Sequence, residues 1–178
     1  MIEHRIVTRD DRALQVLEGG DRNGPAVLVH NGTPNSRLLF GPDLARAQRR
    51  GIRLISYDRP GYGGSTPQPR RTVADCAADV RAIAAALKIE RLAVWGISGG
   101  GPHAIACAAL LPDLVPAVAV LASCAPWNSA GLDYFSGMGQ MNAEDIRLVL
   151  GTRSRRAPSA TPIDWTCSRS LPTRCANT

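Results

Sequence analysis

The stretch VWGISGGGPHAIACA, residues 94–108, decides the fold. An apolar run leads into GISGG, residues 96–100, and an alanine-rich segment follows. This order predicts a buried strand, a sharp turn and a helix, with Ser98 at the apex of the turn. A turn this tight needs residues without side-chain bulk where backbone passes close by, which explains Gly96 and Gly100. We therefore expect the Ser98 hydroxyl to be exposed beside the start of a helix, in a strained backbone conformation.

Strand and helix patterns alternate on both sides of this stretch. Four runs are apolar without strict alternation and end at turn signals, which predicts strands buried on both faces: 25–30, 53–58, 91–96 and 116–123. Three segments have helical character, the second opening with Thr72 and Asp75 at the spacing of a capping box: 41–50, 72–88 and 101–112. The alternation predicts an α/β fold with a mostly parallel sheet and helices on both faces.

Residues 4–20 can form a leading hairpin with its turn near Asp10 and Asp11. The hairpin brings the predicted sheet to six strands, of which the sixth ends near Ala122. The length of 178 residues fits one domain, and a hydrophobic content of 44% can fill its core. No apolar run approaches the roughly 18 residues of a membrane span, and the N-terminus is charged, so we expect a cytoplasmic protein without membrane contact.

The net charge of +6 is concentrated at the C-terminal end. Residues 151–178 hold five arginines and one aspartate, so that only a small excess remains for the rest of the chain. No basic stripe with interleaved aromatics is present, and we expect no nucleic-acid partner. The five cysteines are scattered without a CxxC pair, which favours free thiols, with Cys76 and Cys107 as small buried hydrophobes. No metal and no organic cofactor is implied.

Two further motifs, taken with the serine turn, give a resemblance to the α/β-hydrolase family over about residues 7–150. HNGTPNS, residues 30–36, resembles the HGxP oxyanion loop of that family, with Gly32 in the glycine position. The resemblance implies an oxyanion hole formed by the N–H groups of Thr33 and Gly99.

YDRPGYGGS, residues 57–65, is similar to the DxRGxGxS loop of the same family, which mainly shapes the site. By this resemblance Asp58 is expected to be a structural acceptor within its loop. Asn31 stands where the family more often has histidine. The three motifs are specific for the fold and only weakly specific for the substrate.

Acyl transfer needs a nucleophile, a base that takes its proton, an acid that orients the base, and donors for the oxyanion. None of the three histidines suits the role of the base. His4 is expected in solvent, and His30 in a structural hydrogen-bonding role below the oxyanion loop. His103 follows Ser98 by five residues, which turns it about 140° around the helix. Asp133 is expected to be a solvated loop carboxylate, so the catalytic histidine and acid stay unassigned.

The resemblance implies that both missing groups follow later strands and a cap segment. We expect residues 1–124 to form the hydrolase core and 125–150 to begin the cap, with a helix capped by Asn142. Residues 151–178 are rich in Ser, Thr, Pro and Arg without apolar periodicity, which predicts a low-complexity tail outside the fold. The composition of this tail is typical of a GC-rich gene read out of frame. The sequence thus suggests a family member truncated after its sixth strand.

Two functional hypotheses remain open. In the first, the chain derives from a serine hydrolase of ester or related acyl substrates that acts through an acyl-enzyme on Ser98, and it is inactive or impaired in this form. A serine nucleophile argues against the dehalogenases and epoxide hydrolases of the family, whereas peptidase, lactonase, acyltransferase and cofactor-free peroxidase chemistry stay open. In the second, the chain is a noncatalytic scaffold that binds a ligand or partner. In either case the sixth strand would be an apolar edge that invites self-association.

Overall fold

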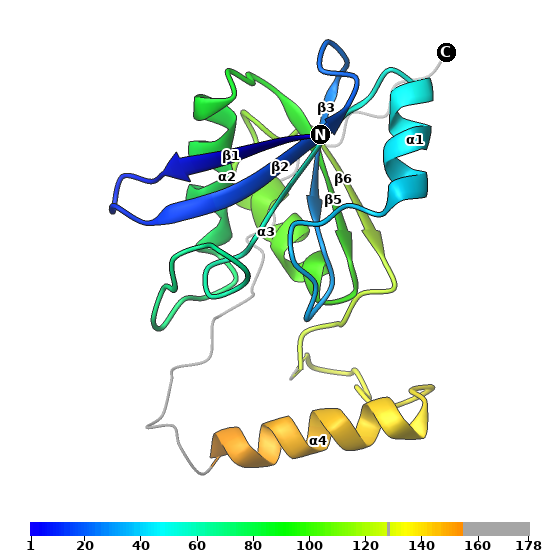
Figure 1. Cartoon of the computed structure of the whole chain (residues 1–178). Helices are drawn as coiled ribbons and strands as arrows, with labels where there is room; N and C mark the ends of the chain where they lie inside the picture. The colour runs from blue at the N-terminus through cyan, green and yellow to red at the C-terminus, as the bar shows by residue number, and fades with distance from the viewer. Residues whose placement is uncertain (128, 155–178) are drawn as a thin grey trace, which may run out of the picture. The chain divides into compact units, whose positions relative to one another are not determined.

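The computed structural model describes residues 1–127 and 129–154. The chain divides into two compact units, residues 1–129 and 130–178. The elements follow one another in this order (Figure 1): β1 (Ile2–Val7), β2 (Ala13–Gly20), β3 (Ala26–His30), α1 (Gly41–Arg49), β4 (Arg53–Tyr57), α2 (Cys76–Ala86), β5 (Leu92–Ile97), the short 3₁₀ helix η1 (Ser98–Gly100), α3 (Gly101–Leu110), β6 (Ala117–Leu121) and α4 (Gln140–Ser154).

The first unit holds one six-stranded sheet with the order β1-β2-β4-β3-β5-β6. β1 pairs antiparallel with β2, and β2 pairs antiparallel with β4, whereas the remaining pairs are parallel. The predicted mostly parallel sheet of six strands is confirmed. The predicted hairpin is also present, since the N–H of Thr8 donates to the carbonyl of Arg12 at 2.8 Å, and Asp11 in the turn has a φ of 60°.

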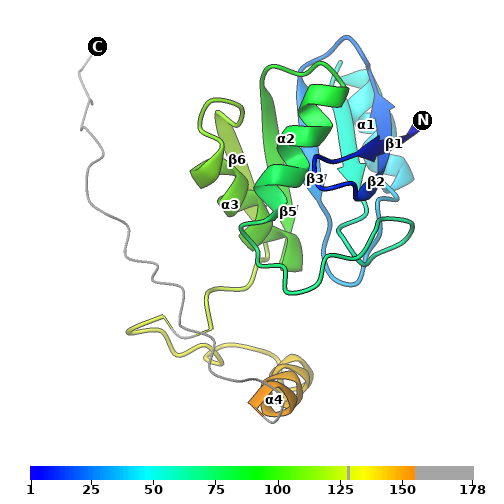
Figure 2. The ribbon, with the colours of Figure 1, turned by 90° about the vertical axis from the view of Figure 1, so that its left-hand side faces the viewer.

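Helices lie on both sides of the sheet, as the alternating pattern predicts. Figure 1 shows α1 on one side of the strands and α2 on the other, and in Figure 2 α2 is nearest the viewer. Val80 and Ile83 of α2 and Cys107 of α3 form the larger core with Leu28 and Ile55, all fully buried. These strand residues alternate with ones that face the other way, which gives the sheet two apolar faces.

The smaller core lies on the α1 side. Ala47 of α1 packs with Val29 and Leu54, and the partly buried Trp95 of β5 joins them. Trp95 and the fully buried Val94 are neighbours in sequence, so they point to opposite faces of the sheet. The strand that leads to Ser98 is thereby held from both sides.

The N-terminus of α2 differs from the prediction. The helix begins at Cys76, four residues after the predicted start, and Asp75 precedes it without a side-chain capping bond. Thr72 donates to the Asp75 carboxylate through its N–H at 2.5 Å and its hydroxyl at 2.9 Å. The carboxylate therefore closes a local turn before the helix, and the reciprocal bond of a capping box is missing.

The second unit contains α4, which we describe by itself. It begins at Gln140, two residues before the predicted cap Asn142, and continues to Ser154, beyond residue 150, where the predicted cap segment ends. The tail predicted for residues 151–178 lies outside the described residues from residue 155 onward. Among the helices that the structure describes, none is long and apolar enough to cross a membrane.

β6 is exposed along its whole length. In the described chain it pairs with β5 alone, and all five of its residues are exposed. The exposed fraction is 45% for Val118 and Leu121 and 40% for Val120. The strand carries no charged residue, although charges are a common protection for the edge of a sheet.

Candidate active site

Ser98 lies where β5 passes into η1, and it is exposed. Its φ of 50° falls in the left-handed region that residues with a Cβ rarely adopt, at a cost of about 1–2 kcal/mol. The strained turn predicted from the glycine pattern is thus present. Beside it, the Ser123 hydroxyl donates to the Ser98 carbonyl at 3.0 Å and ties the turn to the end of β6.

The glycines around Ser98 allow close backbone contacts. A Cβ placed on Gly96 would lie 2.6 Å from the Gly100 carbonyl oxygen and 2.8 Å from the Ala104 side chain. A Cβ on Gly100 would overlap the carbonyl oxygen of His30. These contacts seat η1 directly against the ends of β3 and β5, which explains why a larger residue would not fit.

The loop after β3 reaches the serine turn. A Cβ on the buried Gly32 would lie 3.3 Å from Ser98 Cβ and 3.9 Å from Ser98 Oγ. A Cβ on Gly99 would lie 2.6 Å from Thr33 Oγ1 and 3.3 Å from the Thr33 backbone nitrogen. Two segments about 65 residues apart in sequence therefore meet at Ser98, as their positions at the carboxyl ends of adjacent parallel strands predict.

Both backbone N–H groups assigned to the predicted oxyanion hole are available as donors. Within the part of the chain that the structure describes, the Thr33 N–H donates no hydrogen bond. The Gly99 N–H belongs to the first turn of η1, where N–H groups have no partner within the helix. Unpaired donors beside a serine hydroxyl can stabilise an oxyanion.

Arg59 holds the loop after β3, a role that sequence analysis missed. The buried guanidinium donates to the Asn31 carbonyl through Nη1, and Nη2 lies 3.3 Å from both the Gly32 carbonyl and Thr33 Oγ1. The Tyr62 ring lies beneath it, 5.0 Å from ring centroid to Cζ. The sequence signal for this role is an arginine followed three residues later by an aromatic residue, Arg59 and Tyr62.

Asn31 takes part in the loop through its side chain. Its Nδ2 donates to the Ser36 carbonyl at 2.8 Å and to Ser56 Oγ at 3.0 Å. The first bond closes the loop on itself, and the second fastens the loop to the end of β4. An amide at this position therefore has suitable acceptors on both sides.

Asp58 is fully buried in the loop after β4. Its carboxylate accepts from the Arg37 N–H at 2.6 Å, from Arg37 Nη1 at 2.8 Å and from the Gly64 N–H at 3.1 Å. A Cβ on Gly63, whose φ is 48°, would overlap this carboxylate. Asp58 thus connects the loop after β3 with the loop after β4, and within the described residues no hydrogen bond joins it to Ser98.

His30 and His103 lie on the inner side of the serine turn, where His30 is buried and His103 is half-buried. His103 Nδ1 is 3.1 Å from the Gly99 carbonyl oxygen, and its ring stacks on that of His30 at 5.9 Å. Burial, with a smaller effect from the His103 charge, lowers the pKa of His30 from 6.5 to about 3. Burial and the Arg59 charge lower the pKa of His103 from 6.5 to about 4. Both rings are therefore neutral at pH 7, and the Gly99 carbonyl accepts from a protonated Nδ1 of His103.

The expectation for His4 is wrong. Its Nε2 lies 2.8 Å from the buried Glu18 carboxylate, and about three quarters of its side chain is covered. A strand pairing decides this contact, because His4 and Val16 are opposite in the β1–β2 register, two residues from Glu18. Asp133 belongs to the second unit, where it is exposed and accepts from the Phe135 N–H at 3.1 Å.

The two helix cysteines form a buried contact under the same turn. Cys76 Sγ and Cys107 Sγ are 3.6 Å apart, and Cys107 Sγ is 3.4 Å from His30 Nε2. Both are free thiols, as predicted. In the described residues no group of three His, Cys, Asp or Glu side chains is arranged to hold a metal ion.

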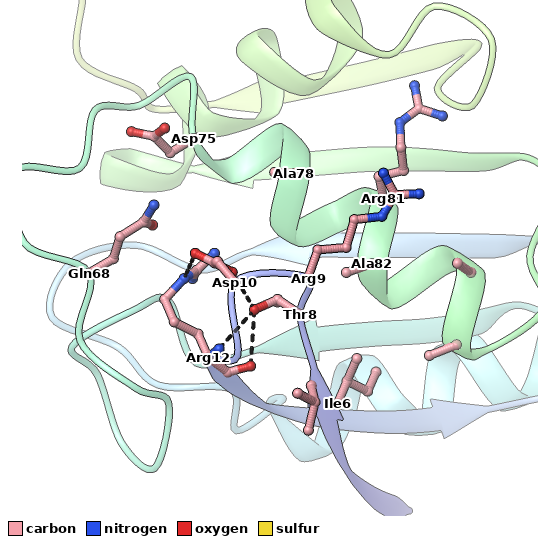
Figure 3. A pocket seen from close by; sticks show the side chains of 13 residues that line it. Ile6, Thr8, Arg9, Asp10, Arg12, Gln68, Asp75, Ala78, Arg81 and Ala82 are labelled. Atoms are coloured by element: carbon pink, nitrogen blue, oxygen red, sulfur yellow. Dashed lines mark hydrogen bonds and ion pairs between the residues drawn. The ribbon is translucent and has the colours of Figure 1, made fainter.

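A hollow in the first unit is lined by residues other than those around Ser98. It has a volume of about 560 Å³ and lies between the β1–β2 turn and α2. Figure 3 shows its polar side, where Arg12 Nε donates to the Asp10 carboxylate at 2.6 Å and the Thr8 hydroxyl donates to the same group at 2.6 Å. None of its lining residues belongs to the loop after β3 or to η1.

A sequence model of the alpha/beta hydrolase fold matches residues 25–162, well over half of the chain. The chain belongs to this family. An enol-lactonase of Acinetobacter baylyi, 3-oxoadipate enol-lactonase 1, is 32% identical over 100 residues, which are 56% of this chain and 37% of that protein. A proline iminopeptidase of Xylella fastidiosa is 31% identical over 121 residues, or 62% of this chain and 36% of that protein.

Solved structures agree on the fold. A thermophilic esterase from Thermogutta terrifontis superposes with a TM-score of 0.65 at 22% identity, covering 88% of this chain and 54% of the esterase. Such an identity supports the fold alone. The chain spans less than half the length of the two curated relatives named above.

Proposed function

We propose that Ser98 is the nucleophile of a serine hydrolase site for ester or related acyl substrates. In the reaction, Ser98 Oγ attacks the acyl carbon, and the alcohol leaves with the proton of the serine hydroxyl. Water then hydrolyses the acyl-enzyme, which releases the acid and restores the Ser98 hydroxyl. The observation that carries the proposal is the exposed Ser98 at a φ of 50° with the Gly32–Thr33 loop packed against it. Strain at an exposed serine persists only where surrounding contacts hold it, and such strain is common at reactive centres.

The N–H groups of Thr33 and Gly99 would stabilise the oxyanion of the tetrahedral intermediate. Their support is the close approach of Gly99 to Thr33 and the absence of another acceptor for the Thr33 N–H within the described residues. One donor of this kind contributes about 10²–10³ in rate in well-studied hydrolases. The relatives include a lactonase and an iminopeptidase, which act on different bonds. The proposal therefore defines the substrate only as a compound with an acyl group.

No base for Ser98 is available in the part of the chain that the structure describes. His30 is buried below the turn, His103 is bonded to the Gly99 carbonyl, and His4 is bonded to Glu18. A serine hydroxyl without a base is a weak nucleophile at neutral pH. We therefore expect slow turnover of simple esters by this chain.

The test compares the chain with Ser98→Ala in the hydrolysis of p-nitrophenyl acetate. We expect a slow release of nitrophenol that Ser98→Ala removes, with Ser136→Ala as the control because Ser136 is an exposed serine of the second unit, outside the proposed chemistry. Equal rates for the chain and Ser98→Ala would count against the proposal. Because no base is available in the described residues, noncatalytic binding is the second candidate, and saturable binding that survives Ser98→Ala without turnover would favour it.

Two further proposals concern the organisation of the chain. Residues 1–124 would form the catalytic core, residues 125–150 would begin a cap segment, and residues 151–178 would stay outside the fold. Limited proteolysis tests this division by the order in which cleavage sites appear. The exposed apolar strand β6 would mediate self-association, since its unpaired edge can add a strand from a second molecule.

A further inference from the structure

The carbonyl of Gly32 and the N–H of Thr33 belong to the same peptide group. In a planar trans peptide the two bonds point in opposite directions, so that a contact on the carbonyl fixes the direction of the N–H. Two donors hold the Gly32 carbonyl: Arg59 Nη2 at 3.3 Å and the Asn35 N–H at 3.0 Å. The Thr33 N–H on the other side is the proposed oxyanion donor.

Arg59 is held in place by burial and by the Tyr62 ring. Only 5% of the residue is exposed, and the Tyr62 ring lies under the guanidinium. Besides the Gly32 carbonyl, the guanidinium contacts the preceding carbonyl of Asn31 and the following hydroxyl of Thr33. Three successive residues of the oxyanion loop are thereby held by one side chain, and a planar fork of donors is suited to such a set of acceptors.

We infer that Arg59 is a positioning residue that orients the Gly32–Thr33 peptide and strengthens the Thr33 N–H as an oxyanion donor. The inference rests on the proposed function of Ser98 and extends it. A cation on the carbonyl oxygen polarises the whole amide, which makes the opposite N–H a stronger donor. In a buried site this charge is weakly screened, so it also favours negative charge that develops near Thr33.

If Arg59 were only structural, its substitution would change the stability of the fold but not the strength of the Thr33 N–H as a donor. Arg59→Lys separates the two roles, because lysine keeps the positive charge and the long stem but has no planar fork. Arg12→Lys is the matched control: Arg12 is also buried, with Nη2 2.8 Å from Asp79, but it lies at the β1–β2 turn. Tyr62→Leu is a second test variant that removes the ring below Arg59 and leaves the arginine in place.

The experiment measures the rate at which a fluorophosphonate labels Ser98, together with thermal unfolding and the NMR shift of the Thr33 amide proton. In the labelling step a bond forms between Ser98 Oγ and phosphorus, fluoride leaves, and the hydroxyl proton goes to solvent. We expect Arg59→Lys to label roughly 10-fold more slowly or worse. The Thr33 amide proton should move upfield, whereas Arg12→Lys should keep both values and Tyr62→Leu should be intermediate.

An unchanged labelling rate in Arg59→Lys, or an unmoved Thr33 resonance, would overturn the inference and leave the proposed function intact. If the unmodified chain is not labelled at Ser98, the proposed function fails, and the Thr33 resonance alone then decides whether Arg59 orients the peptide. If Arg59→Lys does not fold, Tyr62→Leu decides by the same two measurements.

Discussion

Gly99 and Thr33 approach so closely that a Cβ on Gly99 would lie 2.6 Å from Thr33 Oγ1. One residue follows the serine at the end of β5, and the other belongs to the loop after β3. Since β3 and β5 are parallel neighbours, the sheet itself brings the two segments together. The proposed oxyanion hole therefore depends on the absence of a side chain at position 99.

Gly99→Ala should slow the fluorophosphonate labelling of Ser98. The added methyl group would push Thr33 and its N–H away, and loss of one oxyanion donor costs about 10²–10³ in rate. Gly41→Ala is the control because a Cβ at Gly41 meets no atom within 4 Å. The double variant Gly99→Ala/Thr33→Ala should recover part of the rate, since Thr33→Ala removes the clashing hydroxyl. If the double variant is labelled no faster than Gly99→Ala, a steric cause is contradicted.

Ser98→Gly should be more stable than Ser98→Ala. Glycine adopts a φ of 50° without the penalty that a Cβ brings, and the gain is reduced by the extra freedom of glycine in the unfolded chain. We expect a difference of up to about 1 kcal/mol in the free energy of unfolding, measured by urea titration. An alanine variant of equal or greater stability would indicate that the turn is not strained.

The stability of the first unit should fall as the pH drops below about 6.5. The pKa values of His30 and His103 are lowered to about 3 and about 4, so between these values and 6.5 the unfolded chain binds more protons than the folded chain. Folding stability then rises with pH across this window and is complete above it. Each unit of lowered pKa corresponds to about 1.4 kcal/mol.

The measurement is the NMR titration of the two histidine rings together with thermal unfolding between pH 4 and pH 8. His103→Asn should reduce the dependence of unfolding on pH, because one of the two titrating rings is gone and His30 remains. A His103 midpoint near 6.5 would contradict the burial and charge effects described for this ring.

Leu121→Lys should reduce self-association of the chain. Leu121 is 45% exposed on β6, and a charge on an edge strand opposes the addition of another strand. The control is Leu110→Lys, which places the same charge at a residue that is 51% exposed on α3. Gel filtration at several concentrations distinguishes the variants, and a chain that is monomeric before any substitution would contradict the proposal.

The order of elements could be predicted from sequence because each carries a local signal. Buried strands such as 53–57 are largely apolar runs between turn residues. α1 begins at the predicted residue 41 and ends one residue early, and β5 is shifted by one residue at both ends. The start of α2 could not be predicted, since the Thr72–Asp75 contact is compatible with both a capping box and a separate turn. The start of α4 was misplaced by two residues, because a cap residue such as Asn142 also occurs inside a helix.

The candidate site shows the same division. The motif around Ser98 and the Gly32–Thr33 loop are local patterns, so both could be found in the sequence. The Arg59 clamp and the contact of His103 with the Gly99 carbonyl depend on how separate loops meet above the sheet. The pairing of His4 with Glu18 likewise depends on strand register, which sequence periodicity does not fix here.

The most direct test of the central proposal is mass spectrometry of the folded chain after treatment with a fluorophosphonate. We expect the label on Ser98, at a rate above that of the chain unfolded in urea, and no label at that peptide in Ser98→Ala. Ser123 and Ser129 serve as internal comparisons within the same spectrum. A folded chain whose Ser98 reacts no faster than the unfolded chain, or no faster than these other serines, would contradict the proposal.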